Sequence, residues 1–559
     1  MHRLVAIAAI VAPALVHAII GAPLPASAAD EVVAVVACDP YADLKKQVRW
    51  VGTLVDQPAL DALAETPIMM ATQFKGLAGL DVTRPIGLVV AAAGDQPAIH
   101  AYVPVKDLAK LLDSLSGILG PVEEADGVRR VSPPGGEPLD IVEKNGWAIV
   151  GRQGSAPSVA DPGDLFGGVV KQYTLGVQAY PSRMPEGMRQ QLRAALEQVV
   201  ALAAAQGPAI DPAGIAGLSE SLQNVESLLL GATIDSERQR VYVESWSRMQ
   251  PGPAAAALGD MARGSATVPT PATTDGKPPV LSAHLAMLLP ESLRQAAAAG
   301  LTSITPPEDA DAGTKAVSAI VGALIGAMID AGAYDAALSI DTSGVSKAAD
   351  VPTVTVGMKV KDGAALEATV KKIVADAGET PGLKAAFDTG KAAGANLHTL
   401  TLENPAGPDG PGGKSLDLTL AVAPNYVYAL AGGDVPGRLA AVAGGSGKPD
   451  PAVKPMADVN VALGPLLRYM AVMARAESDV PGPDPAGLEA AAKVADAEPS
   501  ALVQVLVRPI ERGMALRLSA DAGAIRTVAT SVKAGGGAAG PGAPVPGGPA
   551  PIPFAIPPR

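Results

Sequence analysis

The chain has 559 residues, with 43 Lys and Arg against 56 Asp and Glu, and a formal net charge of −13. Because an acidic chain repels phosphate backbones and no run of lysines gathers positive charge locally, the composition excludes nucleic-acid binding and argues against attraction to anionic membranes. Aromatic residues make up only 3% of the chain, so its core must be filled largely by Ala, Val and Leu.

Residues 1–28 have the pattern of a secretory signal peptide. Arg3 is followed by an uncharged stretch from Leu4 to Ile20 and then by the small residues Ala26-Ser27-Ala28. This apolar stretch is short for a membrane span. We therefore expect cleavage after Ala28 and an exported protein, located in the periplasm, in the cell envelope or outside the cell.

The single cysteine, Cys38, excludes an intramolecular disulfide. It ends an apolar stretch, Val32–Cys38, that predicts a strand in which the thiol is a small buried hydrophobe. A lipoprotein attachment site is the alternative, but Asp30 and Glu31 interrupt the apolar stretch that should lead into such a cysteine. A helix is expected after Asp39-Pro40.

Two segments repeat the same pattern at an offset of 255 residues, Pro97–Leu111 and Pro352–Leu366. Each begins with an alternating stretch that predicts a half-buried strand, and each reaches Val-Lys-Asp eight residues after its first proline. Asp107 and Asp362 then precede apolar residues at helical spacing, so both predict a helix capped by aspartate.

Further elements recur in the same order. A hairpin is predicted at Asn145-Gly146 and another near Pro424-Asn425, and two longer strand pairs are predicted at Leu228–Trp246 and Leu502–Ala520. We interpret these repeats as an internal duplication. The predicted domains are a first half at residues 30–263, a Gly/Ser/Thr/Pro-rich linker at 264–279, a second half at 280–533, and a disordered Pro/Gly/Ala-rich tail at 534–559.

The longest apolar stretch of the mature chain is Ala316–Ile329, which contains Gly322 and Gly326. Fourteen residues are too few to span a membrane. The stretch therefore predicts a buried helix whose glycines admit a close neighbour.

Residues typical of catalytic and metal sites occur only in isolation. His100, His284 and His398 lie singly in strand-like stretches, without the spacing of a metal motif, and predict half-buried or edge histidines. Gly413-Lys414-Ser415 lacks the preceding glycine and the following helix of a phosphate loop. Asp309 and Asp311 do not continue into a calcium-binding series. The sequence thus predicts no catalytic, cofactor-binding or metal-binding residue.

The combination of strands, helices opening with Pro-Glu, and the Val-Lys-Asp pattern resembles uncharacterised exported bacterial proteins of duplicated α+β build. Pro185-Glu186 and Pro290-Glu291 carry it together with the two Val-Lys-Asp motifs. The resemblance covers about Val32 to Val532. It implies the duplicated architecture and carries over no catalytic residue.

We therefore predict an α+β protein in which each half is an antiparallel sheet covered on one side by helices. The favoured function is a non-enzymatic, exported cell-envelope protein with a structural or binding role, whose partner is a protein or an apolar ligand. One alternative is a carrier for an apolar ligand. The other is a hydrolase whose site assembles between the halves, with His100 or His284 and distant acids.

Overall fold

The computed structural model describes most of the chain between Glu31 and Gly535. The described residues are 31–93, 96–125, 127–155, 157, 159–190, 194, 224–264, 267–268, 278–300, 310, 312–378, 382–403, 415–432, 437–439, 455–476 and 484–535. The predicted signal peptide and the tail beyond Gly535 lie outside this part of the chain, as do Asp309, Asp311, Gly413 and Lys414.

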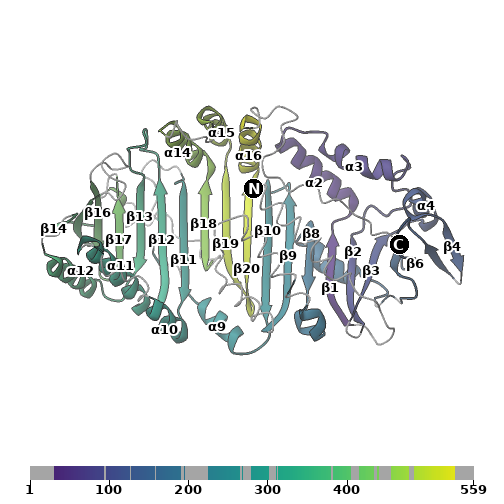
Figure 1. Ribbon diagram of the computed structural model, residues 1–559, viewed down its shortest axis with the longest axis horizontal. Helices are drawn as coiled ribbons and strands as arrows, with labels where there is room; N and C mark the ends of the chain where they lie inside the picture. The colour runs from purple at the N-terminus through teal and green to yellow at the C-terminus, as the bar shows by residue number, and fades with distance from the viewer. Residues whose placement is uncertain are drawn as a thin grey trace.

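Twenty strands form one large antiparallel sheet, and helices accompany it, so the predicted mixed α+β class is confirmed (Figure 1). The first ten strands are β1 Glu31–Cys38, β2 Ile86–Ala93, β3 Gln96–Pro104, β4 Val122–Ala125, β5 Val128–Val131, β6 Leu139–Lys144, β7 Trp147–Arg152, β8 Leu175–Ala179, β9 Val225–Asp235 and β10 Arg240–Met249. The others are β11 Leu281–Leu288, β12 Ala333–Asp341, β13 Thr353–Lys359, β14 Leu383–Ala392, β15 Ala395–Glu403, β16 Ser415–Val422, β17 Tyr426–Ala431, β18 Ala457–Ala462, β19 Leu502–Ile510 and β20 Gly513–Asp521.

The strand order follows the same pattern inward from both ends of the sheet, with strand numbers that differ by ten. It runs β4-β5-β6-β7-β3-β2-β1-β8-β9-β10 and continues β20-β19-β18-β11-β12-β13-β17-β16-β15-β14. Each pairing among β1–β10 therefore has a counterpart ten strands later. The two sets meet at one antiparallel pair, β10 with β20, in which Glu244 faces Arg517.

Two details of the predicted fold are wrong. The strands form one continuous sheet instead of one sheet per half, because β10 and β20 use each other's edge and leave no free edge at the centre. Helices also cover both faces of the sheet near its ends. Among β1–β10, Val35 and Tyr102 pack under one helix, α6 (Gly163–Val170), whereas Val103 lies on the opposite face under α4 (Leu108–Ser114).

Most helices gather along two margins of the sheet. In Figure 1 one margin carries α2, α3, α14, α15 and α16, and the other carries α9 to α12. Their bounds are α2 Tyr41–Leu54, α3 Leu60–Ala71, α5 Ser116–Leu119, α9 Pro253–Met261, α10 Glu291–Gly300, α11 Ala312–Asp330, α12 Gly363–Ala377, α14 Leu463–Ala476, α15 Pro485–Ala497 and α16 Ala522–Gly535.

Local predictions agree with the structure where side-chain chemistry sets the backbone. Asp107 accepts a hydrogen bond from the Lys110 amide at 3.0 Å, and Asp362 accepts one from the Ala365 amide at 3.0 Å, so both cap their helices. Asn145 and Gly146 have φ of 55° and 73°, as a two-residue hairpin turn requires. Cys38 ends β1, and burial raises the pKa of its thiol.

The helix predicted at Ala316–Ile329 is present as α11, but it is buried on one side only. It is the one helix among the described residues that is long and apolar enough to cross a membrane. Ile320 is buried against α12, whereas Val321 is 40% exposed. The expected close neighbour at Gly322 is not there, because a Cβ at that position would meet open space.

Candidate functional site

At the centre of the sheet, one face presents uncharged side chains over the residues named below, although Glu226, paired with Arg512, continues the same alternation at the start of β9. In an antiparallel sheet, paired residues share a face and successive residues alternate between faces. The register assigns the following residues of the six central strands to this face, which we call the apolar face: Leu228, Leu230, Ala232 and Ile234 on β9; Val241, Val243, Ser245 and Ser247 on β10; Met514, Leu516, Leu518 and Ala520 on β20; Val503, Val505, Val507 and Pro509 on β19; Ala457, Val459 and Val461 on β18; Leu281, Ala283, Leu285 and Met287 on β11.

No residue of the apolar face is fully buried. All are partly exposed, and Leu516 on β20 is 46% exposed although its strand lies at the middle of the sheet. On the same side of the sheet nearer its ends, Leu420 is 1% exposed beneath α11 and α12. The helices therefore cover this side at the ends but leave apolar side chains accessible at the centre.

Helices border the apolar face along one margin. Leu54 of α2 and Ile525 of α16 form a small buried cluster with Val241 and Ala520 at the margin of the apolar face. Further along the strands, Leu516 is paired with Ser245 on one side and Val507 on the other. Contiguous apolar area left open in this way makes the face a candidate binding surface.

The opposite side of the same strands carries charge. A row across the sheet places Glu244, Arg517, Leu506, Asp458 and His284 on successive strands. We call this side the polar face. The two faces belong to the same strands, so the contrast comes from alternation along each strand and not from different segments of the chain.

Glu244 is a buried carboxylate at the centre of an ion-pair network with two partly exposed arginines, where the two sets of strands meet. It is 2% exposed and accepts hydrogen bonds from the Tyr173 hydroxyl at 2.7 Å and from Arg517 Nε at 2.7 Å. Arg508 Nη2 donates to both carboxylate oxygens of Glu244 at 3.3 Å. Burial acts to raise the pKa of Glu244, but the bonds from Tyr173 and Arg517 outweigh it and lower the pKa, so the carboxylate is ionised. This network ties β10 to β19 and β20.

His284 of β11 lies beside an acid on the adjacent strand, β12. Its Nε2 lies 3.2 Å from Asp335 Oδ1. Asp335 also accepts hydrogen bonds from the amides of Thr267 and Val268 and from the Thr267 hydroxyl, and Val268 is fully buried. The predicted linker therefore contacts β12 at these two residues. Both members of the pair lie within residues 280–533, so it offers no support for a hydrolase site between the halves.

His100 lies on the more buried side of β3. It is 1% exposed and shares its side with the fully buried Tyr102, whereas Ile99 and Val103 are only partly buried. The prediction of a half-buried or edge histidine is therefore wrong for His100, and it is also wrong for His398, which is 1% exposed. The neighbouring strand makes room for the imidazole with a glycine, because a Cβ at Gly151 would lie 2.9 Å from His100 Nε2.

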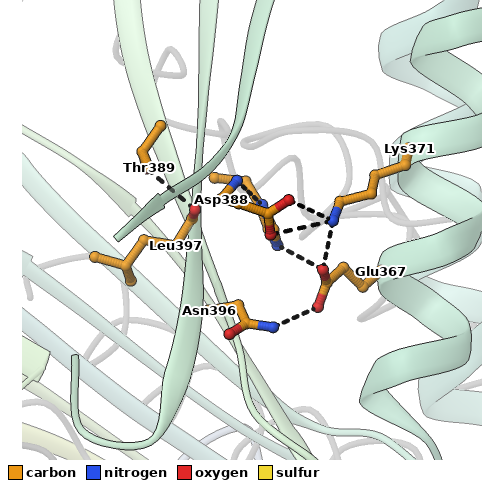
Figure 2. A network of polar contacts seen from close by, with 7 residues as sticks. Glu367, Lys371, Asp388, Thr389, Asn396 and Leu397 are labelled. Carbon is orange, nitrogen blue, oxygen red and sulfur yellow. Dashed lines mark hydrogen bonds and ion pairs between the residues drawn. The ribbon is translucent and has the colours of Figure 1, made fainter. Parts of the chain in front are cut away.

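Figure 2 shows a polar network between α12 and the β14–β15 hairpin that includes Glu367, Lys371, Asp388 and Asn396. His398 also takes part in this network. Lys371 Nζ donates to Glu367 at 2.7 Å and to Asp388 at 2.9 Å, and Asn396 donates to Glu367 at 3.0 Å. The buried His398 ring places Nε2 3.6 Å from Glu367 Oε1. Lys371 lowers the pKa of Glu367, so its carboxylate is ionised, while burial lowers the pKa of His398.

This network does not fit a metal site in its present arrangement. One ligand atom each from Glu367, Asp388 and His398 lies within 4.8 Å of the others, which is close enough for a shared cation. However, the Asp388 amide donates to His398 Nδ1 at 3.1 Å, so the neutral ring carries its hydrogen on Nε2, the atom that would have to bind the metal. The Lys371 ammonium already bridges the two carboxylates. The network joins the β14–β15 hairpin to α12 by hydrogen bonds and ion pairs.

The chain matches none of the protein families, curated proteins or solved structures with which it was compared.

Proposed function

We propose that this chain is an exported, non-enzymatic binding protein of the cell envelope, which carries an apolar ligand on the apolar face of its central sheet. The observation that carries the proposal is the accessibility of that face: six adjacent strands present uncharged side chains, and none of them is fully buried. Nonpolar area left in contact with water favours association with an apolar molecule, at about 25 cal/mol for each Å² covered.

The chemistry of the face also limits the class of ligand. Ser245 and Ser247 are its only side chains with hydrogen-bonding groups. A sugar or a peptide needs several hydrogen-bond partners when it loses water, whereas a hydrocarbon chain needs none. We therefore infer a ligand with a long apolar part, such as an acyl chain or another lipid.

We further propose that the two sets of strands arose by duplication, with a first half at residues 30–263 and a second half at 280–533. The matched pairings of β1–β10 and β11–β20 support this, as do the two aspartate caps at Asp107 and Asp362. A pseudo-twofold axis would then pass between β10 and β20. The apolar face lies across that axis, so the ligand would contact both halves.

The test uses the full mature chain, stripped of bound lipid and titrated with the neutral apolar dye Nile red. We expect dye fluorescence to rise on binding, and Leu516→Asp to weaken dye affinity by about ten-fold or more, because the charge would have to be desolvated beneath the ligand. Val532→Asp, at an exposed apolar position on α16, is the matched control and should bind dye as the parent chain does. Absence of dye uptake by the parent chain, or equal affinity of the Leu516→Asp variant, would overturn the proposal and favour a structural role.

A further inference from the structure

Helix α3 has the reverse orientation of an ordinary surface helix, with acidic side chains facing the protein and apolar side chains facing solvent. Its acidic side chains point toward the protein: Asp61 pairs with Arg49 of α2 at 2.7 Å, and Glu65 pairs with Lys45 at 2.7 Å. Asp61 is buried, and the hydrogen bond from Arg49 lowers its pKa. The acidic side chains of α3 thus bind the helix to α2 through ion pairs.

The opposite side of α3 presents apolar side chains to solvent. Leu63 is 61% exposed and Met70 is 66% exposed, and they lie seven residues apart, on the same side of the helix. Phe74, four residues after Met70, is 75% exposed in a chain that has only four phenylalanines. We call Leu63, Met70 and Phe74 the outer patch. A surface helix normally turns such residues inward, so the outer patch requires a reason.

The turn that carries Phe74 is held in a fixed conformation. Gln73 and Phe74 both have positive φ, 53° and 65°, which is uncommon for residues other than glycine. The Phe74 amide donates to Met69 O at 2.6 Å and closes the end of the helix. Lys75 then bonds to Asp113 next to α5, where Ile118 is also exposed. The ring is therefore presented outward by structure.

We propose that the outer patch docks the protein onto the surface of a lipid bilayer, with α3 lying in the interface and Phe74 inserted among the acyl chains. In Figure 1, α3 lies at the outer margin of the molecule, away from the centre of the sheet. A short helix with one apolar side and one polar side is suited to this position. The inference does not depend on the proposed ligand site.

The charges around the outer patch favour a bilayer with neutral headgroups. The nearby lysines are each paired with an acid: Lys45 with Glu65, Lys46 with Asp43, and Lys75 with Asp113. Anionic lipids would need unpaired positive charge, and a specific protein partner would make about ten hydrogen bonds across its interface. The exposed members of the outer patch offer hydrocarbon and a ring, which is what a bilayer interior accepts.

The test is co-sedimentation of the full chain with phosphatidylcholine vesicles. We expect the parent chain to bind, and the double variant Met70→Glu with Phe74→Glu to lose about ten-fold or more of its vesicle affinity, because two charges cannot enter the acyl region. Val532→Glu, exposed on another helix, is the control and should bind as the parent chain does. Raising NaCl from about 0.1 to about 0.5 M should leave binding unchanged, since no net charge attracts the protein.

Three results would overturn the inference: a parent chain that stays in the supernatant, a double variant that binds as well as the parent chain, or binding that is lost in salt. Sedimentation velocity on the same proteins tests whether the outer patch binds a second copy of the chain instead. A parent chain that is dimeric, together with a double variant that is monomeric, would show that the outer patch pairs with a second copy and would also overturn the bilayer proposal.

Discussion

The two faces of the central strands differ in charge and exposure, although alternate residues of the same strands form both faces. On β20, Ala515 is 1% exposed on the polar face, while the next residue, Leu516, is 46% exposed on the apolar face. Charged side chains lie on the more buried side, where they pair with each other, and hydrocarbon lies on the more open side. Burial alone would place them the other way round. The difference shows that ion pairs join the central strands on the polar face, and it supports the proposal that the apolar face binds a ligand.

Breaking the ion pairs of the polar face should have the largest effect. Arg517→Met removes one of the hydrogen-bond donors to Glu244 and leaves a buried carboxylate with fewer partners, so we expect the free energy of unfolding to fall by about 2–4 kcal/mol. Urea denaturation would measure it. Arg512→Met is the matched control, because Arg512 pairs with Glu226 where both side chains are partly exposed, and it should cost less than about 1 kcal/mol. Equal losses for the two variants would contradict the assigned role of Glu244.

The two neighbouring residues of β20 give a direct comparison of the faces. Ala515→Leu adds volume at a buried position and should lower the free energy of unfolding by about 1–3 kcal/mol. Leu516→Ala removes a half-exposed side chain and should lower it by about 1 kcal/mol or less. Thermal and urea unfolding of both variants measure the difference. If Leu516→Ala proves the more destabilising of the two, the apolar face is covered in solution and cannot be a binding surface.

A smaller effect is expected at the end of the sheet, where α12 covers the side that continues the apolar face. Burial lowers the pKa of His398 below its ordinary value of 6.5, so the unfolded chain binds more protons than the folded chain just below pH 6.5. Stability should therefore fall as the pH drops through that value, and level off below the folded pKa.

The His398→Gln variant tests this assignment, because glutamine can still accept a hydrogen bond from the Asp388 amide but does not titrate. Subtracting its stability from that of the parent chain at each pH removes the contribution of the other acids. A flat difference between about pH 7 and pH 5 would mean that His398 does not control this dependence.

The sequence predicted those parts of the fold that depend on neighbouring residues. The caps at Asp107 and Asp362, the turn at Asn145-Gly146 and the strand ending at Cys38 all depend on local chemistry. The single sheet could not be predicted in this way, because the pairing of Glu244 with Arg517 joins residues 273 positions apart. No local pattern encodes such a partner.

The candidate site was hidden for a related reason. Met514, Leu516 and Leu518 alternate clearly in the sequence, and this pattern indicated a strand with one apolar side. Alternation alone cannot show whether that side is covered, since the covering helices are distant in sequence. The outer patch gave a local signal that was overlooked: Asp61 and Glu65 share one side of a helix while Leu63 and Met70 share the other, and only the contacts of Asp61 and Glu65 with α2 show which side points inward.

The pairing of β10 with β20 also has a consequence for the time course of folding. Closing a loop of more than 260 residues is slow compared with forming hairpins such as β9–β10 or β19–β20. Each set of ten strands can therefore complete its own pairings while the edges of β10 and β20 are still open. At high concentration a second molecule offers the same edge, so β10 of one chain can pair with β20 of another. Refolding at low protein concentration should consequently give more monomer, and slow exchange between monomer and swapped dimer should mark this junction as the last to close.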